Sequence, residues 1–225
     1  MYFFKEYYYY YRFNRIFDEI EKNKIALKDK KILDIGCSRG FLEKNLIERG
    51  YDNIEAWDYK DLRSNDNIYR NQWHYKIVNA ENDWPDKDKK FDIIFALEII
   101  EHIIDTDKFI EQCKNKLNPN GFLIISTPNI ASLRSRANLL IGKYPPEMEY
   151  RNIVHHVRMY TKPTLKSHLK EYGFNDVSCV GVNFLPVNWH KNKSLESISE
   201  FLANKFPELC GNLILIATLD DQNIN

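Results

Sequence analysis

Short apolar runs alternate with amphipathic stretches along most of this chain. Runs of strand length occur at seven places, namely 31–35, 53–58, 73–81, 91–97, 122–127, 177–185 and 212–219. Between several of them apolar residues recur at helical spacing, as in 41–48 and 164–172. This alternation predicts an α/β fold with a doubly wound, mostly parallel seven-stranded sheet, which binds its ligand at the carboxyl ends of the strands.

Three further segments are predicted to be helical additions to this sheet. Residues 1–28 carry a rough helical stripe of apolar residues and would form an N-terminal helical cover. Residues 129–162 have no strand-like alternation and are expected to form a helical lid over the site, and residues 187–209 are expected to contain an inserted helix. The tyrosine run 7–11 either packs against the sheet edge or, with Arg12, closes over the ligand.

Composition narrows the class of protein. A chain of 225 residues is long enough for one α/β domain, 1–225, with insertions. Its 32 basic and 32 acidic residues balance, so overall charge does not indicate a nucleic-acid or membrane partner. The four cysteines are scattered without a C-x-x-C pair, and no stretch approaches the roughly 20 apolar residues of a membrane span. We therefore expect reduced thiols, no membrane span and a cytoplasmic location.

A glycine-rich turn follows the first apolar run. Asp34 stands in that run, and Gly36 and Gly40 follow it. Strand, tight turn and helix in this order let a backbone approach a nucleotide closely. A dinucleotide fingerprint would need glycines two and five residues after Gly36, but Ser38 and Phe41 stand there. The spacing therefore disfavours NAD and fits a pattern of acid, glycine, small residue and glycine at alternate positions.

Polar residues also follow the next strands. Asp58 ends the second apolar run, 18 residues after Gly40, and a carboxylate there can accept both ribose hydroxyls of a nucleoside. The third run ends in Asn79, Ala80 and Glu81. The carboxyl ends of parallel strands meet at one edge of a sheet, so these residues are expected to line one site with the glycine turn.

In this order the strand ends resemble the motifs of the class I S-adenosylmethionine-dependent methyltransferases, over about residues 30–182. Ser38 stands where a glycine is usual in that family, and Asn79 where an aspartate is common. The resemblance implies a Rossmann-like methyltransferase fold, S-adenosyl-L-methionine as cofactor and adenine contacts at the third strand. The cofactor-binding residues that it implies are Asp34, Gly36, Cys37, Ser38, Gly40, Asp58, Tyr59, Asn79, Ala80, Glu81 and Leu97.

The segment after Leu97 carries residues suited to methyl transfer onto a hydroxyl. The nucleophile must lie in line with the leaving sulfur, and a hydroxyl must also lose its proton to a base or bind a metal ion. If the segment is helical, Glu98, Glu101 and His102 are at i, i+3 and i+4 and share one face. Two carboxylates and an imidazole on one face could bind a divalent cation.

A more distant histidine extends this pattern. His156 lies five residues before Thr161, and E-x-x-E-H followed by such a histidine resembles two groups, the ubiquinone-pathway O-methyltransferases and the small-RNA 3′-terminal 2′-O-methyltransferases. The resemblance implies Mg²⁺ or Mn²⁺ held by Glu98, Glu101, His102 and His156. Two alternatives remain open. His102, His156 and Glu101 could act as metal-free acid–base groups, or the motif could only fix the turn.

The acceptor is the least determined part of the function. Residues 129–170 hold eight basic residues and two acidic ones, and a basic wall over the site would suit a phosphate- or carboxylate-bearing acceptor. The leading hypothesis is an O-methyltransferase acting on a small molecule or a sugar. A metal-assisted RNA 2′-O-methyltransferase and a non-catalytic S-adenosylmethionine-binding subunit are the alternatives, and the sequence does not predict an oligomeric state.

Overall fold

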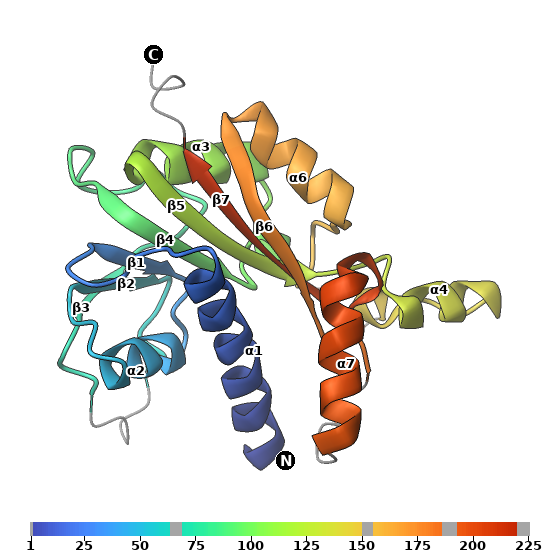
Figure 1. Cartoon of the computed structure of the whole chain (residues 1–225). Coiled ribbons are helices and arrows are strands. Elements are labelled where there is room, and N and C mark those ends of the chain that lie inside the picture. The colour runs from blue at the N-terminus through green and yellow to red at the C-terminus, as the bar shows by residue number, and fades with distance from the viewer. Residues whose placement is uncertain (1, 64–68, 150–154, 186–192, 220–225) are drawn as a thin grey trace.

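A single open sheet forms the centre of the structure. The computed structural model describes residues 2–63, 69–149, 155–185 and 193–219, with the backbone alone for 2–10 and 193 (Figure 1). The strands run in the spatial order β3-β2-β1-β4-β5-β7-β6; β1 to β5 are parallel and β7 is antiparallel to both neighbours. Their bounds are β1 Ile32–Ile35, β2 Ile54–Asp58, β3 His74–Ile77, β4 Phe91–Leu97, β5 Leu117–Pro128, β6 Phe174–Val182 and β7 Asn212–Leu219. The predicted doubly wound, mostly parallel seven-stranded sheet is confirmed.

Helices cover both faces of this sheet. One face carries α1, α2 and α7, and the other carries α3 and α6 (Figure 1). The helices are α1 Tyr2–Lys22, α2 Phe41–Glu48, α3 Thr106–Lys116, α4 Leu133–Leu140, α6 Lys162–Glu171 and α7 Lys193–Lys205. The described 3₁₀ turns are η1 Ile100–His102, η2 Pro146–Met148 and η4 Pro207–Leu209.

The helix α1 packs on the sheet through one apolar stripe. Phe13, Ile16, Phe17 and Ile20 lie at helical spacing and are buried in the same core as Ile32 of β1. On this face Arg15 of α1 also donates to Asn204 of α7. Of the predicted tyrosine run, the side chains of residues 7–10 lie outside the part that the structure describes, while that of Tyr11 is buried.

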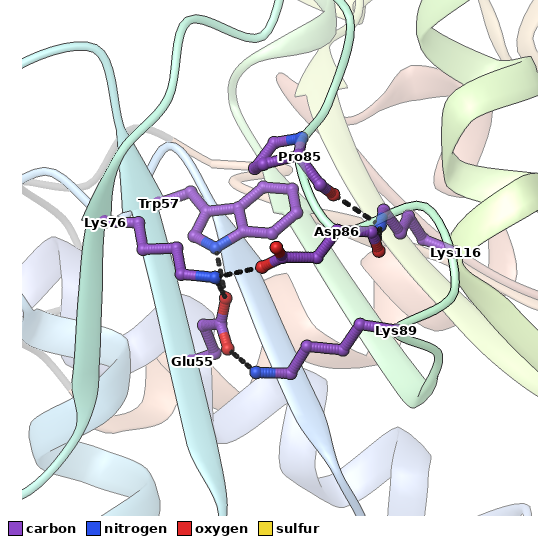
Figure 2. Close-up of polar contacts among 7 residues, drawn as sticks. All are labelled: Glu55, Trp57, Lys76, Pro85, Asp86, Lys89 and Lys116. Carbon is purple, nitrogen blue, oxygen red and sulfur yellow. Dashed lines mark hydrogen bonds and ion pairs between the residues drawn. The ribbon is translucent and has the colours of Figure 1, made fainter.

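Among the described residues, loops rather than a helix cover β2 and β3 on the α3 and α6 face. Glu55 of β2 is almost completely buried there, and its carboxylate accepts from Lys89 and from the Trp57 indole, whose Nε1–Oε1 distance is 2.7 Å (Figure 2). Lys76 of β3 lies 3.2 Å from the same carboxylate and also pairs with Asp86. Because a buried carboxylate is stable only with such partners, this cluster holds the 78–90 loop against the sheet.

Within the described part of the predicted lid, only residues 155–157 line the site. Helix α4 projects away from the sheet (Figure 1), while residues 155–157 return beside the end of β4; residues 150–154 lie outside the described part. Of the predicted insertion 187–209, the described part holds α7 and η4. None of the described helices has the length and apolar character that a membrane crossing needs.

Candidate active site

The glycine turn brings backbone close to the space at the end of β1. Gly36 and Cys37 both donate to the Trp57 carbonyl of β2, at 2.8 and 3.2 Å. Gly36 has φ +83°, and a Cβ at this position would lie 3.0 Å from the Ile99 side chain. Gly40 has φ 78° and opens helix α2. Glycine is favoured at both positions because their backbones are left-handed, which agrees with the predicted strand, turn and helix.

Asp58 bridges the second strand and the glycine turn. Its Oδ2 accepts from the Ser38 backbone N–H at 2.8 Å, while its Oδ1 is buried with no hydrogen-bond partner among the described residues. A buried carboxylate oxygen with no donor has room for one from a ligand. Ser38 itself has φ 50°, so this serine adopts the left-handed backbone that a glycine would adopt. The residues present therefore fit a nucleoside whose hydroxyls donate to Asp58.

Two adjoining cavities, of about 630 and 330 Å³, lie at the carboxyl ends of β1, β2 and β4. They share four lining residues, Gly36, Ser38, Glu98 and His102. The larger is also lined by Asp58, Tyr59, Asn79, Ala80 and Glu81, and the smaller by Asp34, Cys37, Leu97, Glu101 and His156. Of the predicted site residues, Gly40 alone lines neither cavity, because its role is to turn the chain into α2.

The Asn79–Glu81 segment makes local hydrogen bonds beside the larger cavity. The Asn79 carboxamide accepts from the Glu81 N–H at 3.0 Å, and the Glu81 carboxylate accepts from the Ile104 N–H at 2.7 Å. The Ala80 carbonyl accepts from the Trp84 indole at 3.2 Å. These bonds fix the loop that lines the larger cavity.

Two carboxyl groups lie beneath the glycine turn. Asp34 of β1 and Glu43 of α2 are buried, and the two carboxyl oxygens of Glu43 have no hydrogen-bond partner among the described residues. Burial raises the pKa of Asp34 to about 7, with Asp58 adding to the rise, while the neighbouring Glu43 carboxyl and the charge of Arg12 oppose it. Burial, and then the charge of Asp34, raise the pKa of Glu43 well above its usual range. Burial and the neighbouring Asp34 charge therefore favour the protonated form of Glu43.

The predicted helix at the end of β4 is wrong. Glu98 has φ 54°, so the chain turns sharply there and then forms the short 3₁₀ turn η1 instead of an α-helix. The Glu98 carboxylate accepts from Ser126 at 2.8 Å and from Asn212 at 2.9 Å, and it lies 3.5 Å from the Arg12 guanidinium. Glu98 is therefore directed toward β5, β7 and α1 rather than onto one face with Glu101 and His102.

Glu101, His102 and His156 form one cluster. Each offers a ligand atom, and these atoms lie within 4.8 Å of one another. His102 Nδ1 lies 2.7 Å from the His155 carbonyl, which leaves Nε2 available, and the Glu101 carboxylate accepts from Thr127 at 3.2 Å. Three of the four predicted metal ligands therefore meet, and their one oxygen and two nitrogens suit a divalent cation.

The pKa shifts of this cluster also favour proton transfer. Burial lowers the pKa of His156, and the nearby His102 lowers it further, so the imidazole of His156 is neutral near pH 7. Its Nδ1 is buried without a hydrogen-bond partner among the described residues. Burial, and then the charge of Glu98, raise the pKa of Glu101 well above its usual range. A neutral imidazole beside a buried carboxyl can accept a proton from a hydroxyl in the smaller cavity.

Arg12 contributes a charged contact to the site, as one of the two interpretations of the N-terminal segment expected. It is buried and lines the smaller cavity, together with Phe13 of the same helix, so α1 closes this side of the site. The described basic residues of the lid line neither cavity, and Lys162 and Lys166 pair with Glu208 and Asp176 elsewhere. The predicted basic wall is therefore wrong for the described residues (Arg151 lies outside them), and the cation at the site comes from α1.

Several other contacts to the site were missed. Ser126 and Asn212 donate to the Glu98 carboxylate, and Glu43 affects the pKa of Asp34, yet nothing in the local sequence marks Ser126 or Asn212. A signal existed for Glu43, since an acid on the buried stripe of the predicted helix 41–48 needs a buried partner. Asn212 is 114 residues from Glu98, and only the pairing of β5 with β7 brings them together.

Comparison with known proteins agrees with this geometry. The sequence profile of the family described as "Methyltransferase domain" matches residues 8–179. Among curated proteins, the chain is similar to the ubiquinone biosynthesis O-methyltransferase of Rickettsia bellii, with 32% identity over 141 residues, covering 58% of this chain and 54% of that protein. The enzyme of the same name from Bartonella bacilliformis is 29% identical over 178 residues, covering 74% and 69%. The chain spans about half the length of the first of these relatives.

Solved structures show the same fold at low sequence identity. An S-adenosylmethionine-dependent methyltransferase from Mesorhizobium loti superposes with a TM-score of 0.63 at 14% identity, covering 89% of this chain and 96% of that one. One from Clostridium acetobutylicum gives 0.63 at 16% identity, covering 96% and 92%. The family match over most of the chain, the shared fold and the nucleoside-sized cavity beside Asp58 together show that this chain belongs to the class I S-adenosylmethionine-dependent methyltransferases.

Proposed function

We propose that this protein transfers a methyl group from S-adenosylmethionine to a hydroxyl of a small molecule or a sugar. The observation that carries the proposal is the pair of joined cavities. The larger has the buried acceptor oxygen of Asp58, and the smaller has the Glu101, His102 and His156 cluster. The names of the curated relatives support an oxygen acceptor but not a particular substrate.

In this proposal, separate groups of residues bind the two halves of the cofactor and attract the acceptor. The cofactor, when bound, supplies a methyl group already activated on a sulfonium. Asp58, Tyr59 and the 79–81 segment hold the nucleoside half in the larger cavity, and the glycine turn with Leu97 borders the other half. Arg12 provides a positive charge for the cofactor carboxylate or an anionic acceptor. Because both cavities share Gly36 and His102, acceptor and cofactor can meet there.

His156 takes the proton of the acceptor hydroxyl in this proposal. Its imidazole is neutral near pH 7 and can accept a proton, and the Glu101 carboxyl lies in the same cluster, next to the charge that His156 gains. A His156→Asn protein should therefore turn over roughly 100-fold to 10,000-fold more slowly. Its affinity for S-adenosylmethionine should change little, because His156 does not line the larger cavity, which holds the nucleoside half of the cofactor in this proposal. An equal loss of cofactor affinity would assign His156 to binding instead.

A metal-assisted reaction is the second candidate, supported by the three converging ligand atoms. A divalent cation there would lower the pKa of a bound hydroxyl and remove the need for a base. Chelation followed by readdition of Mg²⁺ or Mn²⁺ separates the two candidates. Activity lost and then restored assigns the metal, and activity unaffected by chelation assigns the base. The alternative acceptor, an RNA 2′-hydroxyl, goes with the metal-assisted reaction. Chelation and readdition of the metal ion, with RNA ends as substrate, tests it.

Titration calorimetry tests the cofactor assignment without knowledge of the acceptor. S-adenosylmethionine and S-adenosylhomocysteine should both bind, and NAD should not. Release of S-adenosylhomocysteine on addition of hydroxyl-bearing acceptors would then separate an enzyme from a non-catalytic binding subunit. Tight NAD binding with no heat from either sulfur compound would overturn the proposal.

A further inference from the structure

Glu98 lies between the two cavities at the end of β4 and lines both of them. Its backbone is left-handed, with φ 54°, which is unfavourable for a residue with a side chain. Two hydrogen bonds fix its carboxylate, from Ser126 Oγ to Oε1 at 2.8 Å and from Asn212 Nδ2 to Oε2 at 2.9 Å. Asn212 Oδ1 in turn accepts from Asn183 at 3.1 Å, which orients the amide nitrogen of Asn212 toward Glu98. Both carboxylate oxygens are therefore held in one direction.

The Arg12 guanidinium of α1 lies in that direction. Arg12 Nη1 is 3.5 Å from Glu98 Oε1, and the two side chains are 5% and 22% exposed. Water and salt screen such a pair less than a surface ion pair, so the attraction is stronger. Arg12 lines the smaller cavity, and it is the only lysine or arginine among the described residues that line either cavity. Glu98 thus contacts the one permanent positive charge that these lining residues carry.

The same contacts keep Glu98 away from the cluster of metal-ligand type. The atoms that lie within 4.8 Å of one another come from Glu101, His102 and His156. Both oxygens of Glu98 already accept hydrogen bonds, so a cation bound to them would have to displace the donors. It would also be repelled by Arg12. The E-x-x-E-H resemblance implied a ligand role for Glu98, and the geometry favours a different one.

We propose that Glu98 is a positioning residue that acts through Arg12, holding the guanidinium at the smaller cavity, where Arg12 binds a carboxylate of the ligand. This inference rests on the proposed function. A guanidinium has five N–H donors in a rigid fork, so it can contact Glu98 and a ligand carboxylate together. An arginine already held in place also loses little side-chain entropy when the ligand binds. The carboxylate belongs either to the methionine half of the cofactor or to the acceptor.

A double-mutant cycle tests whether Glu98 acts through Arg12. Arg12→Met removes the charge and should weaken binding of the carboxylate-bearing ligand roughly 10-fold to 100-fold. Glu98→Gln leaves Arg12 charged but less firmly held, so we expect a loss of about threefold to tenfold. In the double variant, Glu98→Gln should add less than about twofold to the loss caused by Arg12→Met. Losses that multiply would show that Glu98 acts without Arg12, as a purely structural residue would, and would overturn the inference.

Titration calorimetry with S-adenosylmethionine and its decarboxylated form identifies the source of the carboxylate. If the cofactor supplies it, both substitutions weaken binding of the first compound and spare the second. If the acceptor supplies it, neither cofactor affinity falls. In that case 3-hydroxybenzoate should bind more weakly to both variants in complex with S-adenosylhomocysteine, and phenol should not. Equal losses for the two cofactor forms, or no loss for any of these compounds, would contradict the inference.

A second arginine of α1 provides the matched control. Arg15 donates to Asn204 of α7 and lines neither cavity, so Arg15→Met should bind all the compounds as the wild type does. A loss as large as that of Arg12→Met would assign the effect to docking of α1 and not to the guanidinium. If Glu98→Gln does not fold, Asn212→Ala releases the same carboxylate and should show the same dependence on Arg12.

Titration with Mn²⁺ tests the metal role directly. Glu98→Gln should bind Mn²⁺ as the wild type does, whereas Glu101→Gln should bind it more weakly than the wild type if the cluster holds a cation. Weaker Mn²⁺ binding by Glu98→Gln would make Glu98 a ligand and overturn the inference. Failure of the wild type to bind either cofactor form would instead reject the proposed function.

Discussion

Glu55→Gln should destabilise the fold without touching the site. The Glu55 side chain is 4% exposed, while those of Lys76 and Lys89 are 37% and 42% exposed. Glutamine keeps an acceptor for the Trp57 indole but loses the charge that both lysines contact (Figure 2). A hydrogen bond to a charged group contributes about 1.5–3 kcal/mol, and the lysines can return to water when the charge is removed. We therefore expect a loss of about 2 kcal/mol rather than the larger cost of breaking a fully buried pair.

The loss should depend on pH in a defined direction. Burial alone would raise the pKa of Glu55, but hydrogen bonds from Lys89, Trp57 and Lys76 outweigh it, and the pKa is lowered from 4.5. A lowered carboxyl pKa stabilises the fold above the unfolded value, and this contribution is lost as the pH falls through the folded value. The stability difference between wild type and Glu55→Gln should therefore be full near neutrality and shrink below pH 4.5.

Urea denaturation at several pH values measures this difference. In thermal unfolding at neutral pH, a loss of about 2 kcal/mol should lower the melting temperature by about 4–8 °C, because 1 kcal/mol shifts it by roughly 2–4 °C in a chain of this size. Glu48→Gln is the matched control, since its pair with Lys44 is 3.8 Å long and solvent-exposed, and it should cost under about 0.5 kcal/mol. A Glu55→Gln protein as stable as the control at neutral pH, or equally destabilised at every pH, would refute the reasoning.

Three other substitutions test separate parts of the structure. Gly36→Ala places a side chain on a backbone with φ +83°, so it should cost about 1–2 kcal/mol in urea denaturation and also weaken cofactor binding. Asp58→Asn keeps an acceptor for Ser38 but loses the charge, and calorimetry should show roughly 10-fold to 100-fold weaker binding of S-adenosylmethionine with an unchanged melting temperature. Asp105→Ala removes the side chain that caps α3, so it should cost about 1 kcal/mol of stability and leave cofactor binding intact. An Asp105→Ala protein that bound the cofactor more weakly would show that α3 and the site are coupled.

The local sequence pattern was sufficient to predict the strands and the part of the site formed by the glycine turn and Asp58. Each apolar run forms a strand because it is long enough to span the core and short enough to exclude a buried helix. The turn at Gly36 and the acid at Asp58 were predictable because backbone conformation and strand-end chemistry depend on neighbouring residues alone. The adjacency of Asp34, Asp58 and the 79–81 segment followed from the rule that parallel strands end at one edge.

Only the tertiary structure decided where the charges at the site are directed. The E-x-x-E-H spacing predicted one helical face, but the left-handed turn at Glu98 sends its carboxylate to Ser126 and Asn212. Neither partner is near in sequence, because β7 returns between β5 and β6 from the far end of the chain. Likewise Arg12 lines the site and Glu43 is buried beside Asp34, and both come from helices whose periodicity showed which face is buried but not which residues that face contacts. The local sequence determines which face of its helix or strand a side chain occupies, whereas the group that the side chain contacts depends on how distant elements pack.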